Sequence, residues 1–258
     1  MIIVVILVNF IHNNSNNPDR DTLTQYSTIN ALLDKVYEGE MTVEEVKQHG
    51  NFGLGTFNSL NGEMVIYNRH VYRISADGVA REPGDDEKIP FTSVTYFETD
   101  LKEYIGAGIG LDSLEKKLDS IIPTKNIFYA IKISGEFERV KTRSVPKQNK
   151  PYKSLAEITK TQPTFEFKNV KGTVIGFRCP QYFEGINVPG YHFHFLTEDR
   201  KAGGHILELI TGKDTLDLDK TSNYSLLLPE NEEFYNLDLT PDKGEILEQV
   251  ERNKKDIK

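Results

Sequence analysis

The sequence predicts an α+β fold in which mixed and antiparallel β-sheets form two closely associated lobes with a few flanking helices. Apolar residues recur at helical spacing in several places, and with a period of two over most of the remaining chain. The composition, 38% hydrophobic and 27% charged over 258 residues, is that of an ordinary globular protein. We expect a mixed α/β lobe over residues 23–134 and a sheet-rich lobe over residues 135–258, preceded by a separate segment over residues 1–22.

Residues 1–22 combine an apolar run with a polar linker. The run from Ile2 to Val8 is too short to span a bilayer. It has the length of a secretory core, but no Lys or Arg precedes it and no small-residue cleavage site follows it. The alternative is a buried or edge strand. We expect a cytoplasmic protein without a membrane partner, while the apolar run leaves export open.

Two short helices open the first lobe. Ser27 begins the first and Gly39 ends it, and the apolar stripe between them consists of Ile29, Leu32, Leu33, Val36 and Tyr37. Thr42 and Glu45 form a capping box that begins the second helix, and Gly50 ends it.

An antiparallel meander follows, because the apolar pattern changes to a period of two. Its strands are expected at residues 53–58, 63–67 and 71–75, separated by the turn pairs Asn61-Gly62, Asn68-Arg69 and Asp77-Gly78. Further strands at residues 91–98 and 127–133 flank a helix that ends at Pro123. The apolar stripe of that helix is Leu111, Leu114, Leu118, Ile121 and Ile122.

The second lobe is expected to consist mostly of strands. They are predicted at residues 136–145, 164–170, 173–178, 191–196, 205–211, 215–219 and 224–228. A short helix follows Pro229, and a charged helix begins after Pro241. The terminal helix is expected to face inward with Ile246, Leu247 and Val250.

Charge and cysteine content exclude several classes of partner and site. The chain has 39 acidic and 31 basic residues, and its net charge of -8 opposes binding to polyanions, so we expect no nucleic-acid partner. The single cysteine, Cys179, cannot close an internal disulfide or complete a four-cysteine zinc site. It is expected to be a packed side chain rather than a nucleophile. The default expectation for assembly is a homodimer.

Three of the six histidines lie in one short region. His192 and His194 are two residues apart in a predicted strand, so their side chains face the same side. Residues 197–204 include Gly203-Gly204 and suit a hairpin that returns His205 alongside them. Three imidazole rings would then meet at one point.

A divalent metal is the ligand that best explains such a cluster. Neutral imidazole nitrogens crowded on an apolar face need a hydrogen-bond donor or a cation. Three protein nitrogens on zinc leave a position open to water or substrate, which is the arrangement of catalytic zinc sites. On this interpretation the second lobe is a metal-binding lobe. The alternative is structural, with each ring hydrogen-bonded to backbone carbonyls across a sheet.

A different metal site would use Glu198. His192, His194 and Glu198 match the His-x-His-x3-Glu run of cupin barrels, which would make the protein a cupin-like metal enzyme or binding protein. However, no second cupin motif is present in the sequence, and Glu198 falls in the predicted turn. We therefore favour a solvated side chain for Glu198.

Two charged residues near the ends of predicted strands are ambiguous on spacing alone. Arg143 precedes the proline that ends its strand, where a guanidinium either holds a carboxylate through two hydrogen bonds or forms a surface ion pair. Glu63 begins a hairpin strand, where carboxylates are usually solvated. The glycines at 106, 108 and 110 follow no clear strand and have no phosphate-binding lysine, so they are interpreted as a flexible loop.

Several motifs occur in a fixed order along the chain. They are Gln25-Tyr26-Ser27-Thr28, Gly53-Leu54-Gly55-Thr56-Phe57-Asn58, Asn61-Gly62-Glu63-Met64, Val140-Lys141-Thr142-Arg143-Ser144-Val145-Pro146, Gly185-Ile186-Asn187-Val188-Pro189-Gly190-Tyr191-His192-Phe193-His194-Phe195-Leu196 and Gly203-Gly204-His205. In this order the sequence resembles the acetolactate decarboxylases, from about Thr24 to the terminal helix. The resemblance implies a zinc-dependent lyase that converts 2-acetolactate to acetoin and carbon dioxide, on the route to butanediol.

The resemblance also implies roles for individual residues. The metal ligands would be His192, His194 and His205, with Zn²⁺ as the cofactor and other divalent ions as alternatives. Arg143 and Glu63 would be catalytic, and Thr56 would contact the substrate in its pocket. Glu251 would be a second catalytic glutamate from the terminal helix, where Glu245 and Glu248 are alternatives nearby.

The implied reaction suits these residue types. Loss of carbon dioxide from a 2-hydroxy-3-keto acid leaves an enediolate, whose negative charge must be stabilised as it develops. We hypothesise that the metal chelates the ketone and hydroxyl oxygens of the substrate. Arg143 would hold the carboxylate, and Glu63 or Glu251 would deliver the proton.

Overall fold

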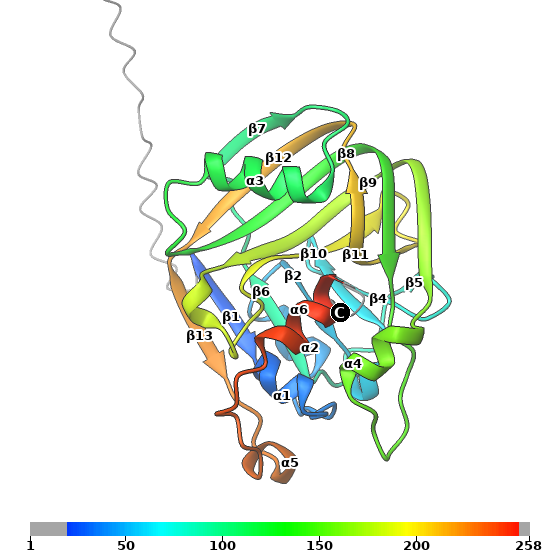
Figure 1. Cartoon of the computed structure of the whole chain (residues 1–258), viewed down its shortest axis with the longest axis vertical. Helices are drawn as coiled ribbons and strands as arrows, with labels where there is room; N and C mark the ends of the chain where they lie inside the picture. The colour runs from blue at the N-terminus through cyan, green and yellow to red at the C-terminus, as the bar shows by residue number, and fades with distance from the viewer. Residues whose placement is uncertain (1–19, 253–258) are drawn as a thin grey trace, which may run out of the picture.

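The protein is described by a computed structural model that covers residues 20–252. The apolar run at residues 2–8, for which a strand was the alternative interpretation, lies outside that range. Within it, two β-sheets pack against each other and short helices lie around their edges (Figure 1). The predicted α+β class, with mixed and antiparallel sheets and a few flanking helices, is confirmed.

The first sheet has seven strands in the order β13-β1-β6-β2-β3-β4-β5. They are β1 (Thr22–Tyr26), β2 (Phe52–Thr56), β3 (Glu63–Tyr67), β4 (His70–Ile74), β5 (Ala80–Arg81), β6 (Phe91–Thr95) and β13 (Asn223–Leu227). Strands β2, β3 and β4 form the predicted antiparallel meander. Because β1 and β13 pair in parallel, the sheet is mixed.

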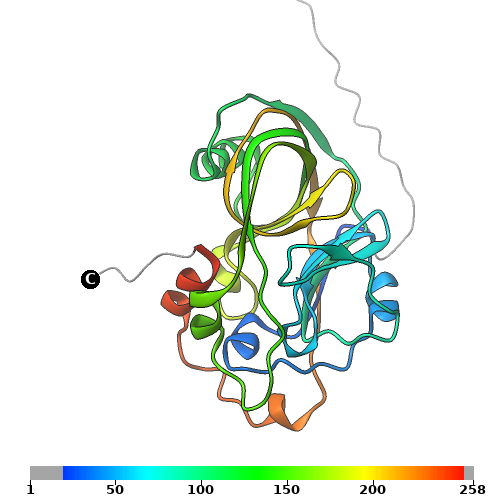
Figure 2. The same ribbon diagram turned by 90° about the vertical axis from the view of Figure 1, so that its right-hand side faces the viewer.

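The second sheet has six strands in the order β11-β10-β9-β8-β12-β7, and β11 also pairs with β8. They are β7 (Leu101–Ile105), β8 (Phe128–Arg143), β9 (Thr164–Cys179), β10 (Gly190–Thr197), β11 (Gly203–Ile210) and β12 (Lys213–Thr221). The first part of β8 pairs with β12 and its last part with β11. The sheet therefore curls round on itself (Figure 2).

Strands β8 and β9 are each one long strand where the sequence pattern predicted two shorter strands. The glycines at the two junctions, Gly135 and Gly172, are register partners in the middle of the ladder. A Cβ on Gly172 would lie 2.4 Å from an atom of the Phe195 ring, so glycine here permits close packing rather than a turn. The expected division between residues 134 and 135 consequently lies inside β8. In addition, β7 joins the second sheet and β13 joins the first, so the sheets exchange strands between the two halves of the sequence.

The helices are short. They are α1 (Ile29–Leu33), α2 (Val43–Lys47), α3 (Leu111–Ile121), α4 (Leu155–Ile158), α5 (Glu232–Tyr235) and α6 (Gly244–Arg252). The predicted capping box of Thr42 and Glu45 at α2 is confirmed. Among the helices that the structure describes, none has both the length and the apolar character needed to cross a bilayer.

Two details of the helix predictions are wrong. Helix α1 is capped by Thr28 instead of Ser27 and ends at Leu33, because Lys35 adopts a left-handed conformation with φ 72°. The residues expected in its last turn, Val36 and Tyr37, are buried outside the helix. In α6, Leu247 and Val250 face inward as predicted, but Ile246 is 45% exposed.

The apolar core forms layers on both sides of the second sheet. Between the two sheets, Leu54 and Val65 belong to the same cluster as Ile175 and Phe177. The opposite side of the second sheet is covered by α3, whose Leu114 is fully buried. A further cluster lies beneath α1, α4 and α6. These three helices thus close one end of the space between the sheets, where the candidate site lies.

Asp219 on β12 carries a pH-dependent cost to stability. Burial, together with the neighbouring Asp100 and Asp21, raises the pKa of its carboxyl from 3.8 to about 8. Between these values the folded protein keeps a proton that the unfolded chain has released, so stability falls as the pH rises from about 4 to about 8.

We expect Asp219→Asn to remove this loss of stability. Asparagine retains an oxygen to accept the Glu98 N–H, which lies 3.1 Å from Asp219 Oδ2. The variant should melt a few degrees above the wild type at pH 8.5 and at about the same temperature near pH 4. Asp217→Asn, two residues along the same strand, is the matched control. It also neutralises an aspartate, but one that is paired with a cation, since Asp217 Oδ2 lies 3.3 Å from Lys132 Nζ. A difference in melting temperature between wild type and Asp219→Asn that stays the same at every pH would contradict the prediction.

Candidate metal centre and active site

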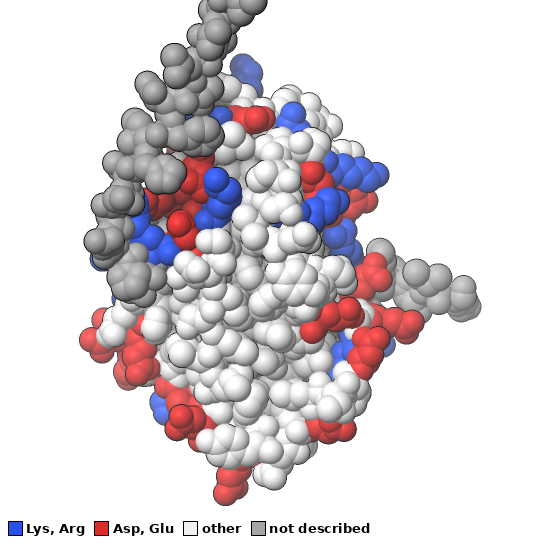
Figure 3. All heavy atoms as spheres, turned by 90° about the vertical axis from the view of Figure 1, so that its left-hand side faces the viewer, with Lys and Arg blue, Asp and Glu red and all other residues white. Residues whose placement is uncertain are grey.

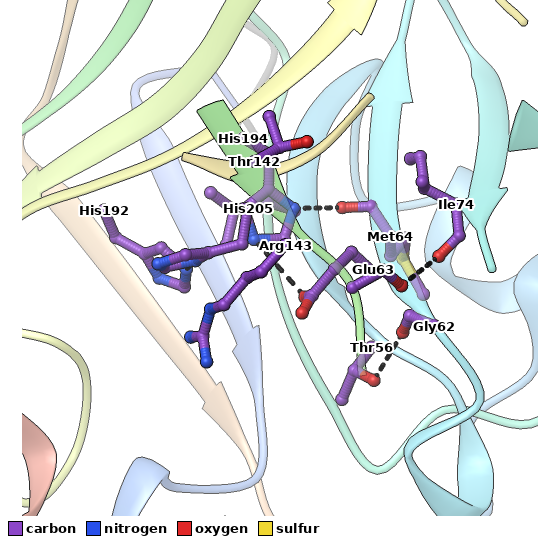
Figure 4. Close-up of polar contacts among 12 residues, drawn as sticks. Thr56, Gly62, Glu63, Met64, Ile74, Thr142, Arg143, His192, His194 and His205 are labelled. Carbon is purple, nitrogen blue, oxygen red and sulfur yellow. Dashed lines mark hydrogen bonds and ion pairs between the residues drawn. The ribbon is translucent and has the colours of Figure 1, made fainter. Parts of the chain in front are cut away.

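The three histidines predicted to converge lie on two paired strands. His192 and His194 project from the same side of β10, and His194 is the cross-strand partner of His205 on β11. The hairpin predicted between the strands is therefore confirmed. The ring centroids lie between 5.0 and 5.4 Å apart. Figure 4 shows the three rings turned toward one region, with Arg143 and Glu63 beside them.

The imidazole nitrogens are arranged to bind a cation. One ring nitrogen from each histidine lies within 4.8 Å of those of the other two. His194 Nδ1 is 2.8 Å from the Met64 carbonyl oxygen, to which it donates, so its Nε2 is left with a free lone pair. That Nε2 is buried and has no hydrogen-bond partner in residues 20–252. An orphaned buried nitrogen is costly in an empty protein interior and is the expected state of a metal ligand.

The histidines are also held in the form that metals bind. Burial, reinforced by the nearby Arg143, lowers the pKa of His192 to about 3. Burial and neighbouring positive groups hold the pKa values of His194 and His205 well below the ordinary value. All three rings are therefore neutral at pH 7, and neutral imidazole is the ligating form.

Two largely buried carboxylates lie beside the histidines. Glu63 begins β3, and its Oε2 is 3.7 Å from His194 Nε2. Glu251 is on α6, and its Oε2 lies 3.6 Å from His192 Nε2 and 3.8 Å from His205 Nε2. This oxygen has no hydrogen-bond partner among the described residues. Sequence spacing could not distinguish Glu251 from its neighbours, but among the terminal glutamates it is the one that lines the cavity.

Burial raises the pKa values of both carboxyl groups. It raises the pKa of Glu63 to about 7, an effect that Arg143 opposes and Glu251 reinforces. Burial likewise raises the pKa of Glu251, while Arg143 and Arg252 lower it. A carboxyl group with a pKa near 7 exchanges protons readily at neutral pH.

Among the residues that the structure describes, Arg143 is the only arginine or lysine in the wall of the cavity. It is the last residue of β8 and pairs with His205 across the sheet. Its side chain is 5% exposed, and its Nη2 lies 3.9 Å from Glu251 Oε1. Nη1 donates to Gln162 Oε1 over 3.0 Å, whereas Nε has no partner among the described residues. The possibility of a surface ion pair is therefore excluded by the structure.

The seven site residues implied by the family resemblance all line one cavity of about 40 Å³. Thr56 is among them, and its hydroxyl donates to the Gly62 carbonyl over 2.8 Å, which leaves its oxygen free to accept a hydrogen bond. The opposite wall is apolar and consists of Ile29, Leu32, Leu60, Phe91, Val145 and Leu155. Spacing gave no signal that these residues form one wall or that Gln162 lies beside the site, because tertiary packing brings the wall together from α1, strand β6 and separate loops and short helices.

The structure does not bring Glu198 to the histidines. Glu198 follows the end of β10, is exposed, and lies with Lys171 and Arg200 in a separate surface hollow. The predicted solvated turn is correct, and the cupin-like ligand set lacks its carboxylate. Cys179 is also as predicted, since it is 2% exposed and burial raises the pKa of its thiol to about 12.

Taken together, the two packed sheets and a three-histidine group beside an arginine and two carboxylates form the arrangement expected of a metal-dependent enzyme. A sequence profile described as alpha-acetolactate decarboxylase matches residues 23–241. The chain belongs to the alpha-acetolactate decarboxylase family.

Individual relatives agree with this assignment over most of their length. The chain is 47% identical to an alpha-acetolactate decarboxylase of Methanosarcina mazei, over 95% of this chain and 84% of that protein. It is 41% identical to that of Bacillus subtilis, over 88% and 89% of the two chains. A crystal structure of alpha-acetolactate decarboxylase from Bacillus subtilis strain 168 superimposes with a TM-score of 0.87 at 39% identity, covering 89% of this chain and 99% of that one.

Proposed function

We propose that this protein decarboxylates 2-acetolactate to acetoin and carbon dioxide. The observation that carries the proposal is the convergence of three neutral histidines, one arginine and two carboxyl groups on a single buried cavity. These groups correspond to the needs of the reaction: a cation to stabilise negative charge, a partner for the leaving carboxylate and a proton donor.

We propose Zn²⁺ as the ion that His192, His194 and His205 hold. Three imidazole nitrogens suit zinc, although other divalent ions accept the same ligands. The unpartnered Nε2 of His194 supports this fit. When bound, the ion supplies Lewis-acid stabilisation of the charge that develops on the ketone and hydroxyl oxygens of the substrate.

Arg143 is proposed to bind the carboxylate that leaves. Its buried guanidinium has unused donors, and a charge-assisted hydrogen bond is strong in a site from which water is largely excluded. The bond between the carboxylate carbon and carbon 2 breaks, its electron pair stays on carbon 2, and carbon dioxide departs. Arg143 then remains beside the enediolate as a positive charge.

Glu63 is proposed to return the proton to carbon 2. Its pKa of about 7 leaves a protonated fraction at neutral pH. From β3, its carboxyl group reaches to within 3.7 Å of His194 Nε2 on β10. Glu251 is the second candidate, because it approaches the histidines from α6. Thr56 is proposed to accept a hydrogen bond from the substrate hydroxyl. The apolar wall suits the methyl groups of 2-acetolactate.

The assembly and location of the protein stay predictions. We propose a cytoplasmic homodimer that binds neither nucleic acid nor membrane. The net charge of -8 supports the first exclusion, and basic and acidic side chains are interspersed in the upper part of the face in Figure 3. Sedimentation of the purified chain would test the homodimer, with a monomer as the contrary result.

An acetoin assay on the purified protein tests the proposed function. We expect acetoin and carbon dioxide to accumulate in equal amounts from 2-acetolactate, at a rate well above that of a protein-free control. The absence of acetoin from a folded, metal-loaded protein would refute the proposal.

A further inference from the structure

Within the described part of the chain, Gln162 makes the one hydrogen bond that holds the guanidinium of Arg143. It follows the short 3-10 turn Thr159–Thr161 and directly precedes Pro163. Its side chain is buried, with the whole residue 9% exposed, and its Oε1 accepts the hydrogen bond from Arg143 Nη1. Gln162 itself does not line the cavity. Gln162 therefore contacts Arg143, which is expected to bind the substrate, but is not expected to contact the substrate itself.

The backbone places the two residues in one local frame. Arg143 and Thr164 are register partners at the ends of β8 and β9. The Ser144 N–H, one residue beyond Arg143, donates to the carbonyl of Pro163, one residue beyond Gln162. Both links lie within two residues of Gln162 on its C-terminal side, so the pairing of β8 with β9 fixes the backbone next to Gln162 and Arg143.

This hydrogen bond selects which edge of the guanidinium is available. A guanidinium offers a carboxylate two parallel donors along one of its edges. Gln162 occupies Nη1, while Nε is buried and unpartnered and Nη2 lies 3.9 Å from Glu251 Oε1. The edge formed by Nε and Nη2 is therefore the one left for a carboxylate ligand.

The chemistry of the acceptor matters as much as its position. An amide oxygen fixes the guanidinium without cancelling its charge, whereas a carboxylate in the same place would neutralise it and compete with an anionic substrate. The Nε2 of Gln162 is itself buried and has no hydrogen-bond partner among the residues described, a cost that a purely structural position would avoid with an apolar residue.

We propose that Gln162 is a positioning residue that orients Arg143 for the carboxylate of the substrate. The inference rests on the proposed decarboxylase function and extends it to a residue outside the cavity. Gln162 acts only through Arg143, so its loss should weaken ligands that carry a carboxylate and spare those that do not.

The test compares two ligands and two variants of the metal-loaded protein. The ligands are 2,3-dihydroxy-2-methylbutanoate, an analogue whose reduced ketone prevents decarboxylation, and acetoin, which has no carboxylate. Their affinities are measured by calorimetry, alongside kcat and KM for 2-acetolactate. Gln162→Met keeps the length of the side chain but removes the acceptor, and Gln162→Glu keeps the acceptor but adds a negative charge. Thr161→Ala, at the exposed neighbouring position, is the matched control.

We expect Gln162→Met to lower the affinity for the analogue and kcat/KM roughly 10-fold or more, with acetoin affinity unchanged. Gln162→Glu should cause the same selective loss, since its charge offsets that of Arg143, and Thr161→Ala should behave as wild type. Wild-type affinity for the analogue in either Gln162 variant, or equal losses for analogue and acetoin, would overturn the inference. If Gln162→Met does not fold, Gln162→Glu decides. Failure of the wild type to produce acetoin is a different result, which refutes the proposed function itself.

Discussion

Replacing His194 by Ala is expected to abolish acetoin formation and to empty the metal site. The Met64 carbonyl holds this ring with Nε2 directed at the other two histidines, and the possible ligand group among the described residues consists of these three histidines. Metal stabilisation of the developing charge contributes several kcal/mol, so we expect a loss of at least about 10³-fold in kcat/KM. Metal content measured by mass spectrometry should fall in parallel.

Glu198→Ala is the control for His194→Ala. Glu198 lies on the turn that joins the same two strands, so both variants alter this hairpin, but Glu198 is exposed and outside the cavity. Its replacement should leave metal content and turnover unchanged. Chelation of the wild type should reproduce the effect of His194→Ala, and added Zn²⁺ should restore activity to the chelated wild type alone. A chelated protein that still makes acetoin at the wild-type rate would rule out the metal-dependent mechanism.

The core of the site could be predicted because it depends on local geometry. His192 and His194 share a face through the alternation of a strand, and Gly203-Gly204 indicates the hairpin that returns His205. Nothing beyond one hairpin is needed to bring these rings together. The capping box at Thr42 is equally local, and it too was correct.

The remaining site residues depend on packing between distant segments. Arg143 is adjacent to His205 only because the end of β8 pairs with β11, a register that spacing does not encode. Glu251 reaches the site because α6 packs across the end of the sheets. Their roles could be suggested only by resemblance to a family, whereas Gln162 belongs to no motif quoted for that resemblance.

The fold shows the same limit. Strand β1 has the polar residues Thr24 and Gln25 at buried positions, so it lacks the alternation of apolar and polar residues that indicates a strand. Strand β7 lies at the edge of its sheet, and its side chains are largely exposed. Neither strand has the apolar pattern on which the sequence prediction relied. Edge exposure and buried hydrogen bonds, such as that of Gln25 Nε2 with the Ile186 carbonyl, are properties of the assembled sheets.

Arg143→Lys is expected to reduce turnover strongly while the protein keeps its metal. Lysine preserves the positive charge but has one ammonium group in place of the planar fork, so it cannot hold a carboxylate through two parallel bonds. If the lysine ammonium group donates to Gln162, no second donor is held in a fixed position toward the cavity. We expect kcat/KM for 2-acetolactate to fall by about 10²-fold, with unchanged metal content.

Arg178→Lys provides the matched comparison for this variant. Arg178 is also a buried arginine at a strand end, but its Nη1 donates to the Lys125 carbonyl over 2.9 Å and it does not line the cavity. Loss of its fork should lower the melting temperature and leave turnover per folded molecule intact. If Arg143→Lys instead changes stability and leaves kcat/KM at the wild-type value, Arg143 supports the fold rather than the substrate. Arg143→Lys thus reports on binding of the substrate carboxylate, whereas Arg178→Lys reports on the cost to stability of altering a buried guanidinium.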